Sequence, residues 1–283
     1  MKEMLNRHGT IAGAALAAVG VGAILLAFVS GSGAASQSSL TVNLPPAATD
    51  RIYAVPQARG RPIVVIDAGH GGRDPGARSV SGQAAEKDLT LALARELRDD
   101  LVKRGRVRVA MTRDDDRYLT LEDRAEVARR LNAAMFVSLH MDSAPNPLAR
   151  GASVYSLSDV ASDPEAARFA ALENAGADVR ENEGSVKSIL SDLAIRAQMN
   201  ASADLAARLV NKSAGRFELR PNPHRFASFH VLRRAGTAAV LFEAGYISNA
   251  DDELELRSPQ HRSQVALALA QAIEADVAAH SRR

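Results

Sequence analysis

The sequence PIVVIDAGHGG, residues 62–72, is the stretch that decides how the fold is interpreted. Its apolar run Ile63–Ile66 is typical of a buried strand, and the run ends in a glycine-rich turn that contains His70. Glycines on both sides of a histidine let the backbone turn tightly and bring the imidazole to the edge of a sheet, where α/β sites usually lie. Taken alone, His70 could equally be an ordinary hydrogen-bonded loop histidine.

Outward from this strand, the chain alternates short apolar runs with segments of helical periodicity. Leucines at four-residue spacing predict a helix over Glu86–Arg104, and alternation in Val107–Met111 predicts a half-buried strand. Thr120 and Asp123 have the spacing of a capping box, which predicts a helix over 121–131. The pattern favours an α/β fold with a single twisted, mostly parallel sheet flanked by helices.

A second histidine follows a second buried strand, because Met135–Leu139 ends at His140. The ends of parallel strands joined by helical crossovers lie on the same rim of a sheet, so His70 and His140 could share a ligand. Glu86 would by itself be an ordinary carboxylate at a helix start. Together the three residues provide the ligand count of a catalytic zinc site whose fourth position is open to water.

An acidic residue closes a third apolar strand, since Ala238–Phe242 is followed by Glu243. Such a residue is either a structural hydrogen-bond acceptor or a catalytic base, and a neighbouring metal site favours the base. Two other histidines are rival ligands. His230 lies in the apolar FHVL run, where a strand side chain would point into or out of the sheet, and His224 lies in a PNPHR segment expected to be a solvent-facing loop.

The composition is that of a globular protein, with 46% apolar and 24% charged residues. Because the chain has no Cys, it can form neither a zinc ribbon nor a thiol nucleophile, and any metal must be held by histidines and carboxylates. The charges are nearly balanced, aromatic residues make up 4% and Trp is missing. We therefore expect no nucleic acid among the partners.

The N-terminal region has the features of an export segment. A basic start precedes Ile11–Val29, which carries no charge and has a length on the border between a cleavable signal and a membrane span. We expect residues 1–35 to be a signal peptide or, if uncleaved, an anchor in the cytoplasmic membrane. Residues 31–60 mix Gly, Ser and Pro with no sustained period, so 36–60 are expected to form a flexible linker, which leaves 61–283 as the catalytic domain.

Several separated segments resemble one known family and occur in that family's order. They are VVIDAGHGGRDPGA (64–77), EKDLTLALARELRDDL (86–101), LTLEDRAEVA (119–128), FVSLHMDSAPN (136–146), RGASVYSLS (150–158), FHVLRR (229–234) and AVLFEAGYISN (239–249). The family is that of the zinc-dependent N-acetylmuramoyl-L-alanine amidases, which trim bacterial peptidoglycan. The resemblance implies Zn²⁺ held by His70, Glu86 and His140, with Glu243 as catalytic residue.

The resemblance also implies a substrate, a location and a biological role. The substrate would be peptidoglycan, cut between N-acetylmuramic acid and L-alanine during wall remodelling or daughter-cell separation. The protein would be exported to the periplasm or cell envelope.

The segment 159–200 is helix-forming and resembles an insertion of division-associated members of the family. In those proteins a helix occludes the zinc site until an activator protein moves it. We expect an autoinhibitory helix that begins at Asp163 and Pro164, although a simple packing helix would show the same pattern. The acidic residues that could fill the open zinc position are Glu173, Glu181 and Glu183, of which Glu173 best matches the family.

Two other functions fit the same residues. A zinc peptidase acting within the stem peptide would use the same ligands, and only the family resemblance argues against it. A non-catalytic envelope-binding protein on a degenerate fold is disfavoured, because all four expected site residues are present. Residues that could line the cleft are Tyr246, Asp142 and Asn146.

Overall fold

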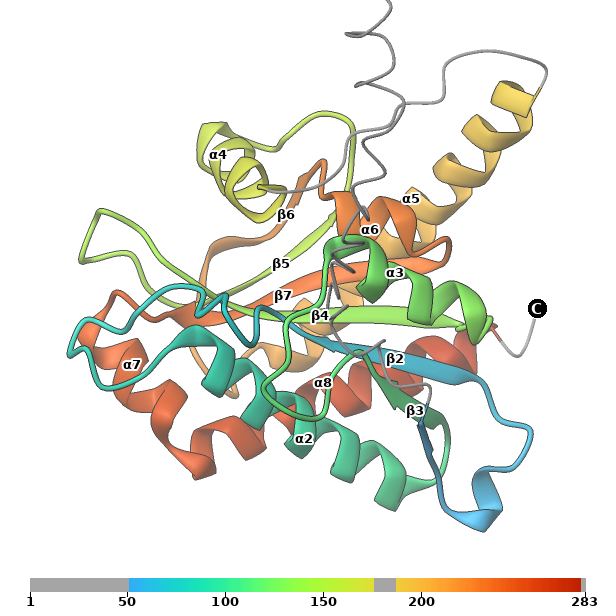
Figure 1. The fold of residues 1–283 in the computed structure, drawn as a ribbon, viewed down its shortest axis with the longest axis horizontal. Coiled ribbons are helices and arrows are strands. Elements are labelled where there is room, and N and C mark those ends of the chain that lie inside the picture. The colour runs from blue at the N-terminus through green and yellow to red at the C-terminus, as the bar shows by residue number, and fades with distance from the viewer. Residues whose placement is uncertain (1–50, 176–186, 281–283) are drawn as a thin grey trace, which may run out of the picture. The chain divides into compact units, whose positions relative to one another are not determined.

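The computed structural model describes residues 51–175 and 187–280. Their centre is a seven-stranded sheet with the order β1-β3-β2-β4-β7-β5-β6 (Figure 1). The strands are β1 (Ile52–Tyr53), β2 (Ile63–Ala68), β3 (Arg108–Met111), β4 (Met135–Asp142), β5 (Ala152–Leu157), β6 (Leu219–Ala227) and β7 (Ala238–Tyr246).

Most neighbouring strands run parallel. β3, β2, β4 and β7 form one parallel block, and β5 joins it antiparallel to β7. β6 pairs parallel to β5, and β1 adds an antiparallel edge beside β3. The predicted α/β fold with a mostly parallel sheet is therefore confirmed.

Helices cover both faces of this sheet (Figure 1). They are α2 (Glu86–Arg104), α3 (Leu121–Arg130), α4 (Pro164–Glu173), α5 (Lys187–Ser213), α6 (His230–Arg234), α7 (Ala250–Arg257) and α8 (Pro259–His280), with a 3₁₀ turn at Pro56–Ala58. The predicted start and end of α2 are confirmed, and α3 begins with the predicted capping box of Thr120 and Asp123.

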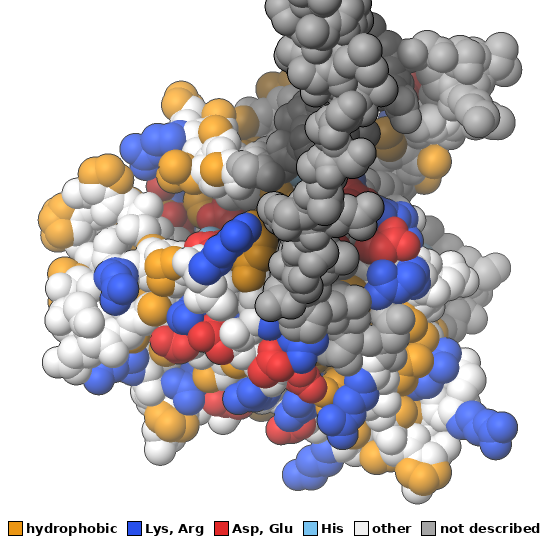
Figure 2. All heavy atoms as spheres, in the orientation of Figure 1, with side chains coloured by type: hydrophobic (Ala, Val, Ile, Leu, Met, Phe, Trp, Pro, Cys, Tyr) orange, Lys and Arg blue, Asp and Glu red, His pale blue; other side chains and the backbone are white. Residues whose placement is uncertain are grey.

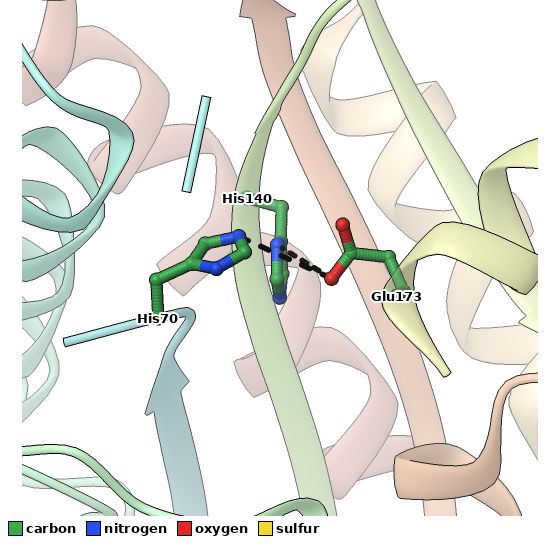
Figure 3. A group of neighbouring side chains, drawn as sticks. All are labelled: His70, His140 and Glu173. Atoms are coloured by element: carbon green, nitrogen blue, oxygen red, sulfur yellow. Dashed lines mark ion pairs between the residues drawn. The ribbon is translucent and has the colours of Figure 1, made fainter. Parts of the chain in front are cut away.

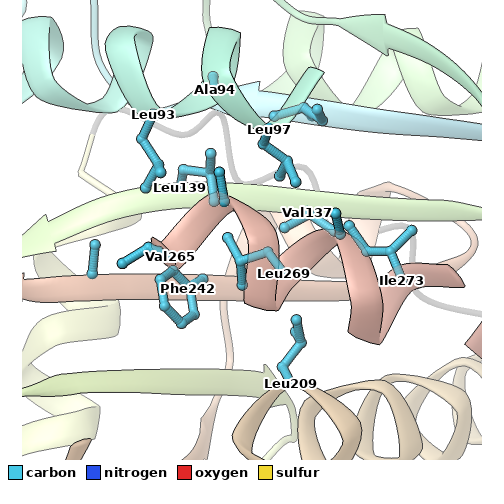
Figure 4. Close-up of a cluster of buried hydrophobic side chains, with 14 of the residues drawn as sticks. Leu93, Ala94, Leu97, Val137, Leu139, Leu209, Phe242, Val265, Leu269 and Ile273 are labelled. Atoms are coloured by element: carbon cyan, nitrogen blue, oxygen red, sulfur yellow. The ribbon is translucent and has the colours of Figure 1, made fainter. Parts of the chain in front are cut away.

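The larger part of the core lies between the sheet and α2, α5 and α8 (Figure 4). Leu93 and Leu97 of α2 meet Leu139 of β4 and Leu269 of α8, and all four side chains are fully buried. A smaller cluster fills the opposite face, where α3, α4 and α6 cover Phe136, Leu241 and their neighbours. Both faces of β4 and β7 are thus covered, as parallel strands require.

Three local predictions were wrong. The sheet begins before residue 61, because Ile52 and Tyr53 of the expected linker pair with β3. The FHVLRR run forms the short helix α6 rather than a strand, so His230 does not alternate across a sheet. His224 lies in strand β6, half-buried, with its Nε2 2.9 Å from Ser156 Oγ, and not in a solvent-facing loop.

The expected export segment, residues 1–35, lies outside the described residues. Among the helices that the structure does describe, none is both long and apolar enough to cross a membrane. On the face shown in Figure 2, basic and acidic side chains are interspersed over the described surface, in keeping with the balanced composition.

Candidate active site

The candidate site lies at the carboxyl ends of β2, β4 and β7. His70 follows β2 in a turn, whereas His140 and Glu243 lie inside β4 and β7, which extend further than predicted. The two strands pair His140 directly with Glu243. The prediction that parallel strands carry His70 and His140 to one edge is confirmed, since their ring centroids are 4.9 Å apart.

Glu86 connects the two histidines. It occupies the first position of α2 and is 3% exposed. Its Oε1 lies 3.1 Å from both His70 Nε2 and His140 Nδ1, and the same oxygen accepts a hydrogen bond from the Met141 N–H. Burial would raise the pKa of Glu86, but the two neighbouring imidazoles hold it well below its usual value.

A second carboxylate orients His70. Asp74 Oδ2 lies 2.8 Å from His70 Nδ1, and this contact leaves Nε2 directed at Glu86 and the site. Such a carboxylate fixes the tautomer and ring orientation of a metal-binding histidine. Burial lowers the pKa of His70, but Glu86, Asp74 and Glu173 outweigh it and raise that pKa to about 10.

Glu173 enters the site from the opposite side, at the end of α4 (Figure 3). Its Oε2 lies 3.4 Å from His140 Nδ1 and 4.0 Å from His70 Nε2. Ligand atoms of His70, His140 and Glu173 all lie within 4.8 Å of one another, which makes this trio a possible metal site. The structure thus brings Glu173 as well as Glu86 to the two histidines.

The helix that carries Glu173 is attached near both of its ends. Asp163 caps its first turn and forms an ion pair with Arg225 of β6, and Glu165 pairs with Arg220 at 3.0 Å. At the other end, the Asn174 side chain donates to Ser228 O and accepts from the N–H of the first residue of α6.

Two buried carboxyl groups near the histidines have oxygens without a hydrogen-bond partner in the described part of the chain. Both oxygens of Glu243 and the Oδ2 of Asp142 are unpaired, and the residues are 0% and 4% exposed. Burial and the nearby charges of Asp142, Glu86 and Glu173 raise the pKa of Glu243 well above its usual value. A carboxyl group whose pKa is raised in this way, and whose oxygens are unpaired, is a candidate for proton exchange.

A cavity of about 440 Å³ opens beside these residues. His70, His140 and Glu173 line it together with Tyr118 of the loop before α3 and Phe229. Asn146 lies elsewhere, in a hollow beside the start of α4, and the Tyr246 hydroxyl bonds Glu165 instead of pointing into this cavity. Glu181 and Glu183, the alternatives to Glu173, are outside the described residues.

Sequence reasoning missed several residues of the site. The Asp74 contact could have been found, because a carboxylate four residues after a candidate ligand is a usual partner of a metal-binding histidine. Asn174 and the buried arginines around the His70 turn carried no such signal, since their partners are backbone carbonyls of distant segments.

Comparisons with known proteins agree with this geometry. Residues 64–275 match the N-acetylmuramoyl-L-alanine amidase family model. The chain is 31% identical to the N-acetylmuramoyl-L-alanine amidase AmiA of Escherichia coli K12, over 80% of each chain. It is 34% identical to AmiC of Neisseria meningitidis serogroup B, over 76% of this chain and 52% of AmiC, so it spans about half the length of that relative.

A solved structure is also similar. The catalytic domain of CwlV, an N-acetylmuramoyl-L-alanine amidase from Bacillus (Paenibacillus) polymyxa, superposes with a TM-score of 0.54 at 29% sequence identity. The match covers 75% of this chain and 96% of that domain.

The close approach of Gly69 to His140 generates a prediction. A Cβ at Gly69 would lie 2.5 Å from both Cε1 and Nε2 of the His140 ring, so Gly69→Ala must displace the imidazole. We expect its affinity for Zn²⁺ to fall by about 10–100-fold, the usual loss when the support of a ligand is disturbed. The measurement is chelator competition on the metal-free protein.

Gly82→Ala is the matched control. Gly82 has a positive φ of 73°, but nothing lies within 4 Å of a Cβ placed there, so only backbone strain is added. The explanation that a Cβ at residue 69 displaces the His140 ring would be wrong if Gly69→Ala bound zinc as tightly as wild type. It would also be wrong if Gly82→Ala lost as much zinc affinity as Gly69→Ala.

Proposed function

The chain belongs to the N-acetylmuramoyl-L-alanine amidase family, and we propose that it uses Zn²⁺ held by His70, Glu86 and His140 to release stem peptides from peptidoglycan. The bond cleaved is the amide between N-acetylmuramic acid and L-alanine. One observation carries the proposal. The His70 and His140 rings each place a nitrogen 3.1 Å from Glu86 Oε1, and all three residues lie inside the segment that matches the family.

The donor set fits zinc. Imidazole nitrogens and a carboxylate oxygen are the ligands of many catalytic zinc sites, and the chain contains no Cys that could compete. His70 Nε2 is buried and faces Glu86 Oε1 at 3.1 Å, while Asp74 occupies the other ring nitrogen. A lone pair is therefore available on the side that faces the other ligands.

Zinc held there would polarise the scissile carbonyl and make an attacking water more acidic. Glu243 would act as general base toward the water that attacks the amide, and then as general acid that gives the proton to the departing amine of L-alanine. Its buried position beside His140 makes both transfers feasible, because a carboxyl group with a raised pKa accepts a proton readily and still donates to an amine.

Glu173 supplies the restraint that an enzyme acting on the cell's own wall needs. Its carboxylate stands beside both histidines, so it can occupy the ligand position that the reaction requires to be open. Burial and the carboxylates of Glu86 and Asp74 raise the pKa of Glu173, and this repulsion would be relieved if the helix moved away. An activator protein that binds the displaced helix would then shift the population toward active enzyme.

A relative that is 32% identical to the chain is named a probable cell wall amidase, which supports a substrate outside the cytoplasm. Residues 1–35 would direct export to the periplasm or cell envelope. The sequence is compatible both with cleavage of this segment and with its retention as an anchor in the cytoplasmic membrane. A peptidase acting within the stem peptide is disfavoured by the family match, and a non-catalytic role by the complete site.

Digestion of purified peptidoglycan by residues 45–283 tests the reaction. We expect free stem peptides and peptide-free glycan by mass spectrometry, no product after chelation, and recovery when Zn²⁺ is restored. Cleaved peptides that leave L-alanine on the glycan would show a peptidase instead. Absence of any product from a folded, zinc-loaded protein that lacks the Glu173 side chain would support the non-catalytic alternative.

The role of Glu243 predicts a separation of metal binding from turnover. Glu243→Gln retains the shape of the side chain but cannot take up a proton, so kcat should fall by about 10²-fold or more while the zinc content stays at the wild-type level. Metal analysis and initial rates on soluble muropeptides measure the two quantities. Loss of zinc from this variant would instead make Glu243 a ligand.

The role of Glu173 predicts activation by its removal. Glu173→Ala should raise the rate without any partner, by about tenfold if the closed form is favoured by about 1.4 kcal/mol. Arg168→Ala is the control, because this exposed side chain on the same helix lines the hollow beside Asn146 rather than the cavity at the histidines. A folded, zinc-loaded Glu173→Ala protein no faster than wild type would show α4 to be only a packing helix.

A further inference from the structure

The backbone at His70 adopts a conformation that a histidine rarely holds without support. Its φ is +58°, in the left-handed region, and the residue is separated from the end of β2 by Gly69 and is followed by two glycines. Side chains with a Cβ are strained there, and such strain persists only where the surrounding structure imposes it. Something must therefore hold the His70 peptide in place.

Arg113 holds the first part of this turn. It follows β3, is 0% exposed, and its Nε donates to Ala68 O at 2.9 Å. Its Nη2 donates to Gly69 O at 2.8 Å and lies 3.1 Å from the hydroxyl of Thr90, which itself donates to Gly69 O. One guanidinium thus fixes two successive carbonyl groups before His70.

Arg124 holds the second part. It comes from α3 and is 3% exposed. Its Nη1 donates to Ala68 O and its Nη2 to His70 O, both at 2.7 Å. The same side chain forms an ion pair with Asp67 Oδ1 at 2.8 Å, and Asp67 also accepts from Ser138 of β4.

These contacts are more than is needed to fill space. Taking a guanidinium out of water is costly unless its donors are satisfied, and every hydrogen bond shown for Arg113 ends on a carbonyl or hydroxyl oxygen rather than a carboxylate. An apolar side chain would avoid this cost but would leave the carbonyls of Ala68 and Gly69 without these donors. A lysine would also carry the charge, but it lacks the flat fork of donors that spans two peptides at once.

We propose that Arg113 and Arg124 are positioning residues that clamp the carbonyls of Ala68, Gly69 and His70, and so hold the His70 imidazole in its ligand geometry. Neither guanidinium touches the proposed metal ligands' side-chain nitrogens; both act through the backbone that carries His70. The inference rests on the proposed role of His70 as a zinc ligand.

The test compares Arg113→Lys and Arg124→Lys with wild type in the full domain. Each lysine keeps the charge but loses part of the clamp, so we expect the affinity for Zn²⁺ to fall by about 10–100-fold, as for other outer partners of ligands. The absorption spectrum of the Co²⁺-substituted protein should change, because it reports ligand geometry. At saturating zinc, kcat should fall while KM changes little.

Arg262→Lys is the matched control. Arg262 also combines an ion pair, to Glu96, with hydrogen bonds to two carbonyls, Leu256 O and Arg257 O, but it lies on α8 away from the site. It should leave zinc affinity and the cobalt spectrum unchanged. An equal loss in Arg262→Lys would show a general effect of weakening arginine contacts and would overturn the positioning role.

A His70→Gly background separates positioning from general stability. Glycine adopts a positive φ without strain and offers no ligand, so Arg113→Lys should cost no additional zinc affinity in that background. If Arg113→Lys lowers the affinity for Zn²⁺ by the same factor in the wild-type and the His70→Gly backgrounds, Arg113 does not act through His70 and the proposal fails.

Thr90→Val provides a milder version if the lysine variants do not fold. It removes one donor to Gly69 O and leaves both arginines, so a smaller loss of zinc affinity and a shifted cobalt spectrum are expected. Unchanged affinity and spectrum in a folded Thr90→Val protein would overturn the clamp. Failure of the proposed reaction is distinguishable, because the zinc and cobalt measurements do not depend on turnover.

Discussion

The parallel pairing of β2, β4 and β7 is the constraint on which the site depends. Directly paired residues point to the same face, so Asp67 with Ser138, and His140 with Glu243, form two polar rows above the smaller core. The alternate residues, such as Phe242, enter the larger core. A one-residue slip of either strand would exchange these faces and bury charge among α2 and α8, so the packing that stabilises the sheet also fixes the site.

The second general feature is the concentration of charge in that site. Three glutamates and two histidines share a small, mostly buried volume, where isolated charges are strongly disfavoured. Opposite charges offset part of this cost, because His70 pairs with Glu86 and Asp74, while burial and the neighbouring carboxylates raise the pKa of Glu243. The proposed Zn²⁺ would add positive charge among these carboxylates and so reduce their mutual repulsion.

The sequence was informative where a pattern depends on local periodicity or strand ends. The bounds of α2, the cap of α3 and the approach of His70 to His140 follow from apolar spacing and parallel pairing alone. The short FHVLRR run was misassigned, because a five-residue helix and a strand edge have the same apolar content. No sequence pattern singles out Arg113, since only the tertiary fold brings the Ala68 carbonyl of β2 to it.

The proposed blocking of the site by Glu173 requires a helix that can move without unfolding the core, and the packing of α4 is compatible with this. Its buried residues are limited to Ala166, Phe169 and Ala170, and its start is tied to β6 by ion pairs of Asp163 and Glu165. Partly exposed ion pairs add little free energy but set a defined geometry. Ion pairs therefore hold the first turn of α4, and the two hydrogen bonds of Asn174 hold the end that carries Glu173. In the proposed blocking role, release of Glu173 would disrupt these few contacts at a cost far below that of unfolding the sheet.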